Sequence, residues 1–360
     1  MKHLYLTCAL LACAPLGCGD NSEEDFTPWV LEDLHGSAGF SLRVPLFEVP
    51  AGHESQNCYF VKVPDINGNG QDIWMDRFLA AINPGSHHVN VFRVKTIIGL
   101  DPAAGSPTML GDYPATVIEG TDDYKHNPCW ASANWADWPL IANSQHTNVG
   151  ELETDWKLPE NVAIRLKPGE LLMLQTHYVN STEQPTMFGA KVGINFYQRQ
   201  QPGTPVEMGS LFATQQNIRI CASQPNPTFS GTCRFPGAVT IAAANGHFHK
   251  RGKSFSIFPW DGSSIDHPTK TSMFYRSDNW NDPPMATNLS VTEPANTGIW
   301  WDCEYQWQPP TEFSCDDVNA KDPLKANDCC YTFGGITDVG EHCNVFMYYY
   351  PKVESDIFCL

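Results

Sequence analysis

Charged residues are scarce in this chain, and no cluster of positive charge is present. Asp, Glu, Lys and Arg make up 17% of the 360 residues, whereas hydrophobic residues make up 42% and can form a real core. The formal net charge is −18. Nucleic-acid binding needs grouped Lys and Arg for phosphate contacts, so the composition argues against a nucleic-acid partner. No segment after the N-terminal region reaches 18 consecutive apolar residues, so we expect no membrane-spanning helix.

Several familiar catalytic and metal-binding motifs are also missing. The chain has no CxxC pair, which argues against a zinc ribbon or a thioredoxin-like redox site. It has no HExxH sequence, so a zincin-type protease is not expected. A glycine-rich phosphate loop and a nucleophile elbow are absent as well. These absences leave other metal chemistry open.

Glycine and proline are abundant, with 27 and 28 residues, and helical periodicity is hard to find. Short alternating stretches dominate instead, and turn signals separate them. This spacing predicts an all-β protein with a β-sandwich or jelly-roll layout. The polar, proline-bearing segment 198–205 is the best linker. It predicts an N-terminal domain at 29–200 and a C-terminal domain at 206–360.

Residues 1–18 have the form of an export signal. Lys2 and His3 precede an apolar run, and the run ends at Gly17 and Cys18. Small residues before a cysteine indicate bacterial lipoprotein cleavage at either Cys13 or Cys18, and simple secretion without a lipid is the alternative. We expect a tether at 19–28 and a periplasmic, outer-membrane-anchored or secreted protein. A membrane would be contacted only through a lipid anchor at Cys18.

The cysteine count favours Cys18 as the lipid-modified residue. Of 13 cysteines, three lie in the signal and ten remain. An even number in an exported chain predicts disulfide bonds, five at most. If Cys13 were modified, Cys18 would be left over. We therefore expect disulfide-stabilised domains.

Two histidine clusters lie far apart in the chain. His247 and His249 are separated by one residue, so on a strand their side chains point to the same face and can share a metal. His87 and His88 are adjacent and would face opposite sides of a regular strand. Both can bind one ion only if the backbone is irregular there or the two rings use different nitrogens, and the turn residues 83–86 leave room for such an irregularity.

Two single histidines could complete the clusters, namely His177 in an apolar strand and His342. Each could also be an ordinary core histidine, and the HxH pair could lie on a solvated strand face. All-imidazole sites suit copper, zinc, iron or nickel. Two such sites in an oxidising compartment favour copper.

Several segments together resemble the copper type II, ascorbate-dependent monooxygenases, which include peptidylglycine α-hydroxylating monooxygenase and dopamine β-monooxygenase. In order, these segments are Cys58-Tyr59-Phe60 with Val63-Pro64, His87-His88-Val89, Leu174-Gln175-Thr176-His177-Tyr178, His247-Phe248-His249 with Gly252, and Gly334-Gly335 through Glu341-His342-Cys343 to Tyr349-Tyr350-Pro351. They span most of residues 58–351 in the order of the family.

The resemblance implies two tandem jelly-roll-type β-sandwich domains with a solvent-filled cleft between them and one copper ion in each. His87, His88 and His177 would hold the electron-storing copper. His247 and His249 would hold the copper at which oxygen binds and the substrate C–H bond is attacked. Ascorbate or a similar reductant would supply the electrons.

The chain departs from the family pattern at the second copper. The third ligand there is usually a methionine, and His342 stands in its place. Met347 lies an odd number of residues away and would face the other side of a regular strand, so His342 is the better ligand. Imidazole also holds Cu(II) well, whereas a thioether favours Cu(I). The exchange predicts retained copper binding with altered redox behaviour.

The substrate positions depart as well. Asn245 stands where peptidylglycine enzymes have an arginine, and Phe346 replaces a tyrosine, although Asn344 matches a substrate-contacting asparagine. A glycine-extended peptide is therefore not expected as the substrate. Gln175 matches a glutamine near the cleft in some members.

Two further signals have structural explanations. Residues 65–76 resemble a calcium loop, but no flanking helices are evident, which favours a hairpin turn. The 11 tryptophans could line a carbohydrate site, but they are more typical of β-sandwich cores.

The sequence thus predicts a copper-dependent monooxygenase of a small organic substrate, with His247, His249 and His342 as catalytic ligands and Asn344 and Asn245 near the substrate. The alternatives are a non-catalytic exported copper-binding protein and a surface adhesion module.

Overall fold

The computed structural model describes residues 31–95, 116–118, 138–145, 151–189, 192–311, 314–319, 328–334, 337–353 and 357–360. The export signal and the tether expected at 1–28 lie outside these residues. Among the described residues, no helix is long and apolar enough to cross a membrane.

The N-terminal half is a β-sandwich of mostly antiparallel strands. One sheet has the order β1-β12-β4-β9-β13 with β8 beside β4, the other has the order β6-β3-β10-β5-β7, and β2 pairs with β11. The elements are η1 (Gly36–Ala38), β1 (Gly39–Arg43), β2 (Phe47–Val49), β3 (Glu54–Lys62), β4 (Ile73–Ala81), β5 (Ser86–Arg93), β6 (Thr116–Ile118), β7 (Leu140–Asn143), β8 (Glu153–Lys157), β9 (Val162–Leu166), β10 (Leu171–Val179), β11 (Thr186–Phe188), β12 (Gly193–Gln198) and β13 (Val206–Glu207).

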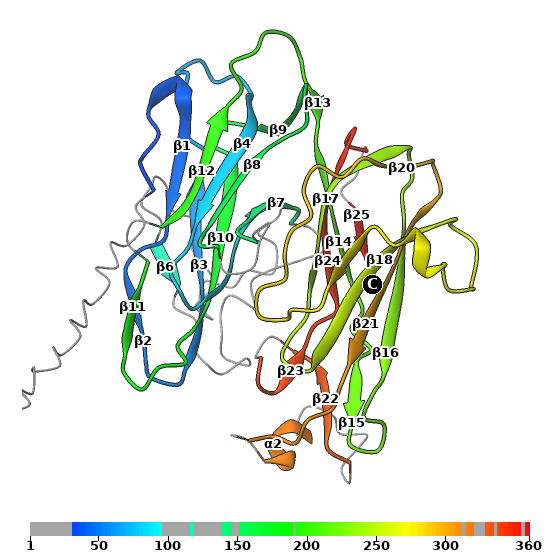
Figure 1. The fold of residues 1–360 in the computed structure, drawn as a ribbon. Coiled ribbons are helices and arrows are strands. Elements are labelled where there is room, and N and C mark those ends of the chain that lie inside the picture. Colours follow the sequence, from blue (N-terminus) through cyan, green and yellow to red (C-terminus); the bar gives the residue numbers. More distant parts are fainter. Residues whose placement is uncertain are drawn as a thin grey trace, which may run out of the picture.

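The C-terminal half is a second sandwich with its own core. Its larger sheet has the order β20-β17-β24-β14-β25, and the facing sheet has the order β16-β21-β18-β19. A small sheet, β15-β22-β23, lies at one end (Figure 1). The elements are β14 (Gly209–Thr214), β15 (Arg219–Cys221), β16 (Thr228–Arg234), β17 (Val239–His247), β18 (Gly252–Trp260), η3 (Lys270–Ser272), β19 (Tyr275–Ser277), β20 (Val291–Glu293), β21 (Gly298–Tyr305), α2 (Cys315–Asn319), β22 (Cys330–Phe333), β23 (Gly340–Glu341), β24 (Asn344–Tyr350) and β25 (Ile357–Cys359).

The expected fold class is confirmed, since the chain is an all-β protein of two sandwiches with disulfide bonds. The bonds join Cys221 to Cys330, Cys233 to Cys359, Cys303 to Cys343 and Cys315 to Cys329. Trp138, Trp156 and Trp301 are buried, as expected for core tryptophans.

Glycines mark the turns that the sequence indicated. Gly85 and Gly169 have φ angles of 87° and 80°, which L side chains rarely adopt. The Asp65 carboxylate accepts hydrogen bonds from the amides of Asn69 and Gly70 at 3.2 and 2.9 Å. This loop is a tight turn, but it is not a hairpin, because β3 and β4 belong to different sheets. The alternation of apolar and polar residues predicts that β3 and β4 are strands, but it does not indicate to which sheet each strand belongs.

The segment between the halves is held by one arginine side chain. Arg199 Nη1 donates to the carbonyl oxygens of Gln201 and Gly203 at 2.6 and 2.9 Å. Beyond it, β13 pairs in parallel with β9 of the N-terminal sandwich. The chain therefore enters the C-terminal sheet only at β14, just after the boundary that the linker predicted.

Strand β24 faces two cores at once. Val345, Met347 and Tyr349 belong to the C-terminal core. Phe346 and Tyr348, on the opposite face of the strand, belong to the N-terminal core. The larger C-terminal sheet is thus buried on both faces, and its outer face is covered by the other half of the molecule.

The two halves lie side by side (Figure 1), and apolar side chains from both belong to one core. Ala242, Ala243 and Met285 join the N-terminal core along with the outer face of β24. The rings of Trp156 and Tyr348 lie 5.0 Å apart between centroids. At this interface, apolar side chains meet where the family resemblance implies a solvent-filled cleft.

Candidate metal centre

His247 and His249 converge at the end of β17. His247 is the last residue of the strand, and His249 follows in the connection to β18. Their ring centroids are 5.3 Å apart. Phe248, between them, is fully buried in the C-terminal core. The i, i+2 spacing thus places both imidazoles on one side, as the sequence predicted.

His342 joins this pair from a distant segment. Its ring centroid lies 5.2 Å from that of His247 and 4.2 Å from that of His249. One ring nitrogen of each histidine lies within 4.8 Å of those of the other two, and all three residues are buried. These three residues, called the second set below, have the arrangement of a three-nitrogen metal site. Met347 points instead into the C-terminal core.

The His342 backbone is fixed on both sides. Cys343 is bonded to Cys303 in β21, and the Tyr305 hydroxyl donates to the His342 carbonyl oxygen. The Phe333 ring lies 4.9 Å from the imidazole. The position of the third histidine is therefore set by covalent and packing contacts that do not require a metal.

The orientation of His249 follows from one hydrogen bond. Its Nδ1 lies 3.2 Å from the carbonyl oxygen of Gly340. A carbonyl can only accept, so Nδ1 carries the proton and Nε2 carries the lone pair. Ligand histidines are commonly fixed in this way by their second nitrogen. A metal bound at this site would therefore be held by Nε2 of His249.

A buried ion pair clamps the loop after His249 onto the segment before His342. Glu341 is fully buried and accepts from the backbone amides of His249 and Arg251 at 3.0 and 2.8 Å. Arg251 Nη1 lies 3.3 Å from the same carboxylate, and its guanidinium stacks on the Tyr331 ring at 3.7 Å. Burial raises the pKa of Glu341 to about 7, although Arg251 opposes this shift.

Two glycines let this region pack closely. A Cβ on Gly252 would lie 1.8 Å from Phe248 Cδ2, and one on Gly246 would lie 2.3 Å from Phe255 Cδ1. Both contacts are far too short for real atoms. Glycine at these positions therefore allows Phe248 to be buried while its two histidine neighbours face the site.

The first set, His87, His88 and His177, begins at an irregularity in β5. His177 pairs with His88, and the next residue, Tyr178, pairs with Ser86, so His87 is an extra residue on β5. A β-bulge of this kind redirects side chains. The His88 and His177 rings lie 5.3 Å apart, and both residues are buried. The position of the His87 side chain is outside the described part of the structure.

His177 has a carboxylate partner. Its Nε2 lies 2.6 Å from Glu54 Oε2, at the start of β3. A carboxylate behind a ligand histidine fixes the tautomer and makes the ring a better donor. A metal held by this ring would have to use Nδ1, because Nε2 is bonded to Glu54.

The two sets are contiguous. The ring centroid of His88, from the first set, lies 5.4 Å from that of His247, from the second set. This separation is close to the 5.3 Å between His88 and His177 and to the 5.2 Å between His247 and His342, whereas His249 and His342 are closer, at 4.2 Å. The imidazoles therefore form one connected series, His177, His88, His247, His342 and His249, across the boundary between the two halves.

The predicted substrate residues lie beside this series. Asn344 pairs with His247 across the sheet and is buried. Asn245 is also buried, and its Nδ2 donates to Gln145 Oε1 at 3.3 Å and to the Pro283 carbonyl at 3.1 Å. The contact with Gln145 thus joins the two halves. Gln175 is buried in β10 and accepts from Asn90 at 3.4 Å.

The donor set fits a first-row transition metal. Three buried imidazoles suit copper, zinc, iron or nickel and do not suit calcium or magnesium, which prefer oxygen ligands. A second group within metal-binding distance, Cys221, Asp328 and Cys330, does not fit, because the two sulfurs are already bonded to each other.

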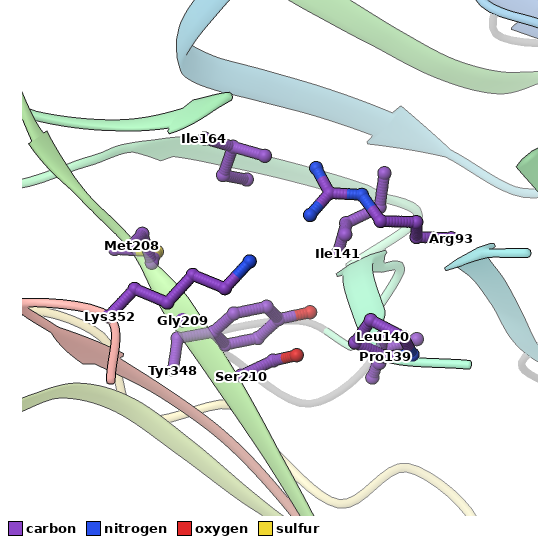
Figure 2. Close-up of a pocket in the computed structure, with 10 residues that line it drawn as sticks. All are labelled: Arg93, Pro139, Leu140, Ile141, Ile164, Met208, Gly209, Ser210, Tyr348 and Lys352. Carbon is purple, nitrogen blue, oxygen red and sulfur yellow. The ribbon is translucent and has the colours of Figure 1, made fainter. Parts of the chain in front are cut away.

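A small pocket of different character lies elsewhere in the interface (Figure 2). Figure 2 shows the Lys352 amine and the Arg93 guanidinium directed toward the same space. Burial lowers the pKa of Lys352, and the nearby Arg93 charge lowers it further. Lys352 contacts Glu207, and Arg93 contacts Glu170, so both charges have carboxylate partners. None of the candidate ligands lines this pocket.

Sequence patterns did not indicate the residues that support the histidines. Glu54 lies 123 positions before His177, and Gln145 lies 100 positions before Asn245. Arg251 and Glu341 are 90 residues apart. Of these supporting residues, only Glu341 could have been singled out from the sequence, because it directly precedes the candidate ligand His342.

Comparisons with known proteins add little to this geometry. No family model and no curated protein matches the chain. Among solved structures, the N-terminal CBM22-1-CBM22-2 tandem domain from Paenibacillus barcinonensis Xyn10C is 9% identical and covers 89% of this chain and 86% of its own. The TM-score of this match is 0.18, so it carries no argument about function. The resemblance to copper monooxygenases stays a prediction.

Proposed function

We propose that the protein is a copper-dependent monooxygenase that hydroxylates a C–H bond of a small organic substrate. The observation that carries the proposal is the burial of His247, His249 and His342 with their ring nitrogens in mutual metal-binding distance. Copper bound there would supply the one-electron redox chemistry that oxygen activation requires. The family resemblance of the sequence supports the choice of metal.

The reaction balances with an external reductant. One atom of O2 enters the C–H bond to give an alcohol, and the other leaves as water. Two electrons and two protons are needed, and ascorbate or a similar exported reductant would supply the electrons. Solvent and the reductant would supply the protons.

The residues of the chain contribute orientation and the exclusion of water. The Gly340 carbonyl fixes the His249 ring, and the Arg251–Glu341 pair fixes the loop that carries it. Glu54 fixes His177 at the other end of the series. Because these contacts are buried or partly buried, the rings would need little reorganisation when a metal binds.

A second candidate function is copper storage or delivery without catalysis. The observation that favours it is the burial of the histidines: His88 and His247 are 8% and 4% exposed, and the Phe346 ring lies 6.1 Å from that of His247. An enzyme must admit its substrate to this region, whereas a storage protein need admit only an ion.

Oxygen uptake distinguishes the two candidates. The protein is loaded with copper, ascorbate is added, and uptake is followed with and without a panel of phenethylamines and short peptides under 18O2. We expect substrate-dependent uptake and 18O in the product, both lost in His249→Ala and retained in His35→Ala, a change at an exposed histidine. Full copper loading without substrate-dependent uptake would overturn the enzyme and favour the binding protein.

A further inference from the structure

The small cavity in Figure 2 is built from both halves of the molecule. Arg93 is the last residue of β5 and Ile164 lies in β9, whereas Ser210 lies in β14 and Tyr348 in β24. The volume of the cavity is about 10 Å³, which is enough for one ligand the size of a water molecule. A ligand bound there would therefore touch both halves at once.

The polar side chains that line this cavity can all donate hydrogen bonds. Arg93 and Lys352 can only donate, and Tyr348 and Ser210 each have a hydroxyl group that can donate. Figure 2 shows the two hydroxyl oxygens beside each other and the two cationic groups directed toward the same space. Among the described residues that line the cavity, none is Asp or Glu. This lining favours an anion and repels a cation.

The Tyr348 hydroxyl is a buried donor that lacks an acceptor. The residue is 2% exposed, and its oxygen has no hydrogen-bond partner among the described residues. Burial raises the pKa of this hydroxyl, so it stays protonated and can donate. A buried polar group without a partner costs free energy, and an acceptor in the cavity would remove that cost.

The carboxylate nearest to Lys352 is shared with a second cation. Glu207 lies 3.2 Å from Lys352 Nζ and 3.1 Å from Arg165 Nε. Burial lowers the pKa of Lys352, and the Arg93 charge lowers it further, although Glu207 opposes the shift. Glu207 therefore offsets the positive charge beside the cavity only in part. A bound anion would stabilise the charged form of Lys352.

We propose that this cavity binds one small monovalent anion of halide size, such as chloride, and that the bound ion fastens the two halves to each other. Arg93 donates to it from the N-terminal half, and Lys352, Tyr348 and Ser210 donate from the C-terminal half. A water molecule would bring two O–H groups for which Arg93 and Lys352 offer no acceptor, whereas a halide accepts from all four side chains. No candidate metal ligand lines the cavity, so the inference does not depend on the proposed function.

Thermal unfolding of the metal-free protein tests the site. Melting temperatures are compared in sodium chloride and in sodium gluconate at equal ionic strength, so that general screening of charges is the same. Chloride at about 100 times its dissociation constant should raise the melting temperature by several degrees, because a ligand that binds only the folded state stabilises it. Gluconate is too large for the cavity. Equal melting temperatures in the two salts would show that no halide binds there and would overturn the proposal.

Two variants localise the effect. Tyr348→Phe removes one donor and keeps the ring that packs on Trp156, and Lys352→Met removes one charge. Both should lose most of the chloride-dependent shift, whereas Lys253→Met, at an exposed position outside the cavity, should retain it.

Nuclear magnetic resonance of 35Cl measures the binding directly on the same samples. We expect excess line broadening in the wild-type protein, and we expect it to fall in both cavity variants. If Lys352→Met does not fold, Tyr348→Phe, which changes a single hydroxyl group, carries the test. A full melting-temperature shift and full broadening in Tyr348→Phe and Lys352→Met would place the ion elsewhere and overturn the proposal.

Discussion

At the scale of single residues, the candidate ligands are held by partners of different kinds. His177 has a carboxylate, Glu54, whereas His249 has a backbone carbonyl, that of Gly340. A carboxylate places a formal negative charge behind the ring and raises its basicity more than a neutral carbonyl does. The first set should therefore hold an oxidised, more highly charged ion well.

Glu54→Gln tests this role. We expect copper affinity at the first set to fall about 10- to 100-fold, as is typical when a partner of a ligand histidine is changed. Affinity at the second set should stay unchanged. Competition with a chelator measures both affinities, and Glu48→Gln, at an exposed position of β2, is the control. Equal affinity in the Glu54 and Glu48 variants would remove Glu54 from the site.

His342 is the residue that departs most from the family pattern. In His342→Ala we expect metal binding to weaken at the second set only, because two imidazoles remain there and the first set is intact. In His342→Met, Cu(I) should be favoured over Cu(II), because a thioether is a softer ligand. Titrations in each oxidation state measure both effects. An unchanged stoichiometry and spectrum in His342→Ala would exclude it as a ligand.

At the scale of elements, irregular backbone does most of the positioning. His87 is the extra residue in the β5 bulge, and His249 lies beyond the end of β17. His342 lies between β23 and β24, held by the disulfide bond from Cys343 to Cys303. Regular strands bring the three segments close together, and their irregular ends direct the imidazoles toward one another.

The disulfide bond beside His342 gives an element-scale prediction. Replacing Cys303 and Cys343 by serine opens a bond that spans 40 residues, which corresponds to a loss of about 4 kcal/mol in the chain-entropy model. Because Cys343 adjoins a candidate ligand, copper affinity at the second set should fall as well. Urea unfolding and chelator competition measure the two effects.

The bond between Cys315 and Cys329 is a matched control. It spans 14 residues, so its loss should cost about 3 kcal/mol. Neither cysteine adjoins a candidate ligand, and copper affinity should be retained. If both serine pairs lowered copper affinity equally, the effect would come from general destabilisation rather than from the position of His342.

At the scale of the whole molecule, the two sandwiches are not independent. The N-terminal core includes residues of the C-terminal half, among them Met285, Phe346 and Tyr348. Domains joined only by a linker unfold separately, but a shared core couples their unfolding.

We therefore expect a single calorimetric transition for the disulfide-intact, metal-free protein, with equal calorimetric and van't Hoff enthalpies. Copper in about 100-fold excess over its dissociation constant should stabilise the protein by about 2.7 kcal/mol per site, and a chelator should reverse this. Trp156→Ala, which removes a ring at the interface, should lower the stability by about 3–5 kcal/mol. Two separated transitions in the wild-type protein would contradict a shared core.

The sequence by itself determined the fold class and the local convergence of histidines. Alternation of apolar residues and glycine turns depend on neighbours in the chain, so they predict the all-β sandwich layout. The same reasoning paired His247 with His249, allowed for an irregularity near His87 and disfavoured Met347, because strand geometry has a fixed period of two.

Tertiary structure alone decided how the two histidine sets meet. His88 and His247 are 159 positions apart, and no local pattern sets the 5.4 Å between their rings. That distance depends on how two sandwiches bury apolar faces against each other, which is a property of packed surfaces and of the side chains that fill them. For the same reason Glu54 and Gln145 became visible as supporting residues only in the folded chain.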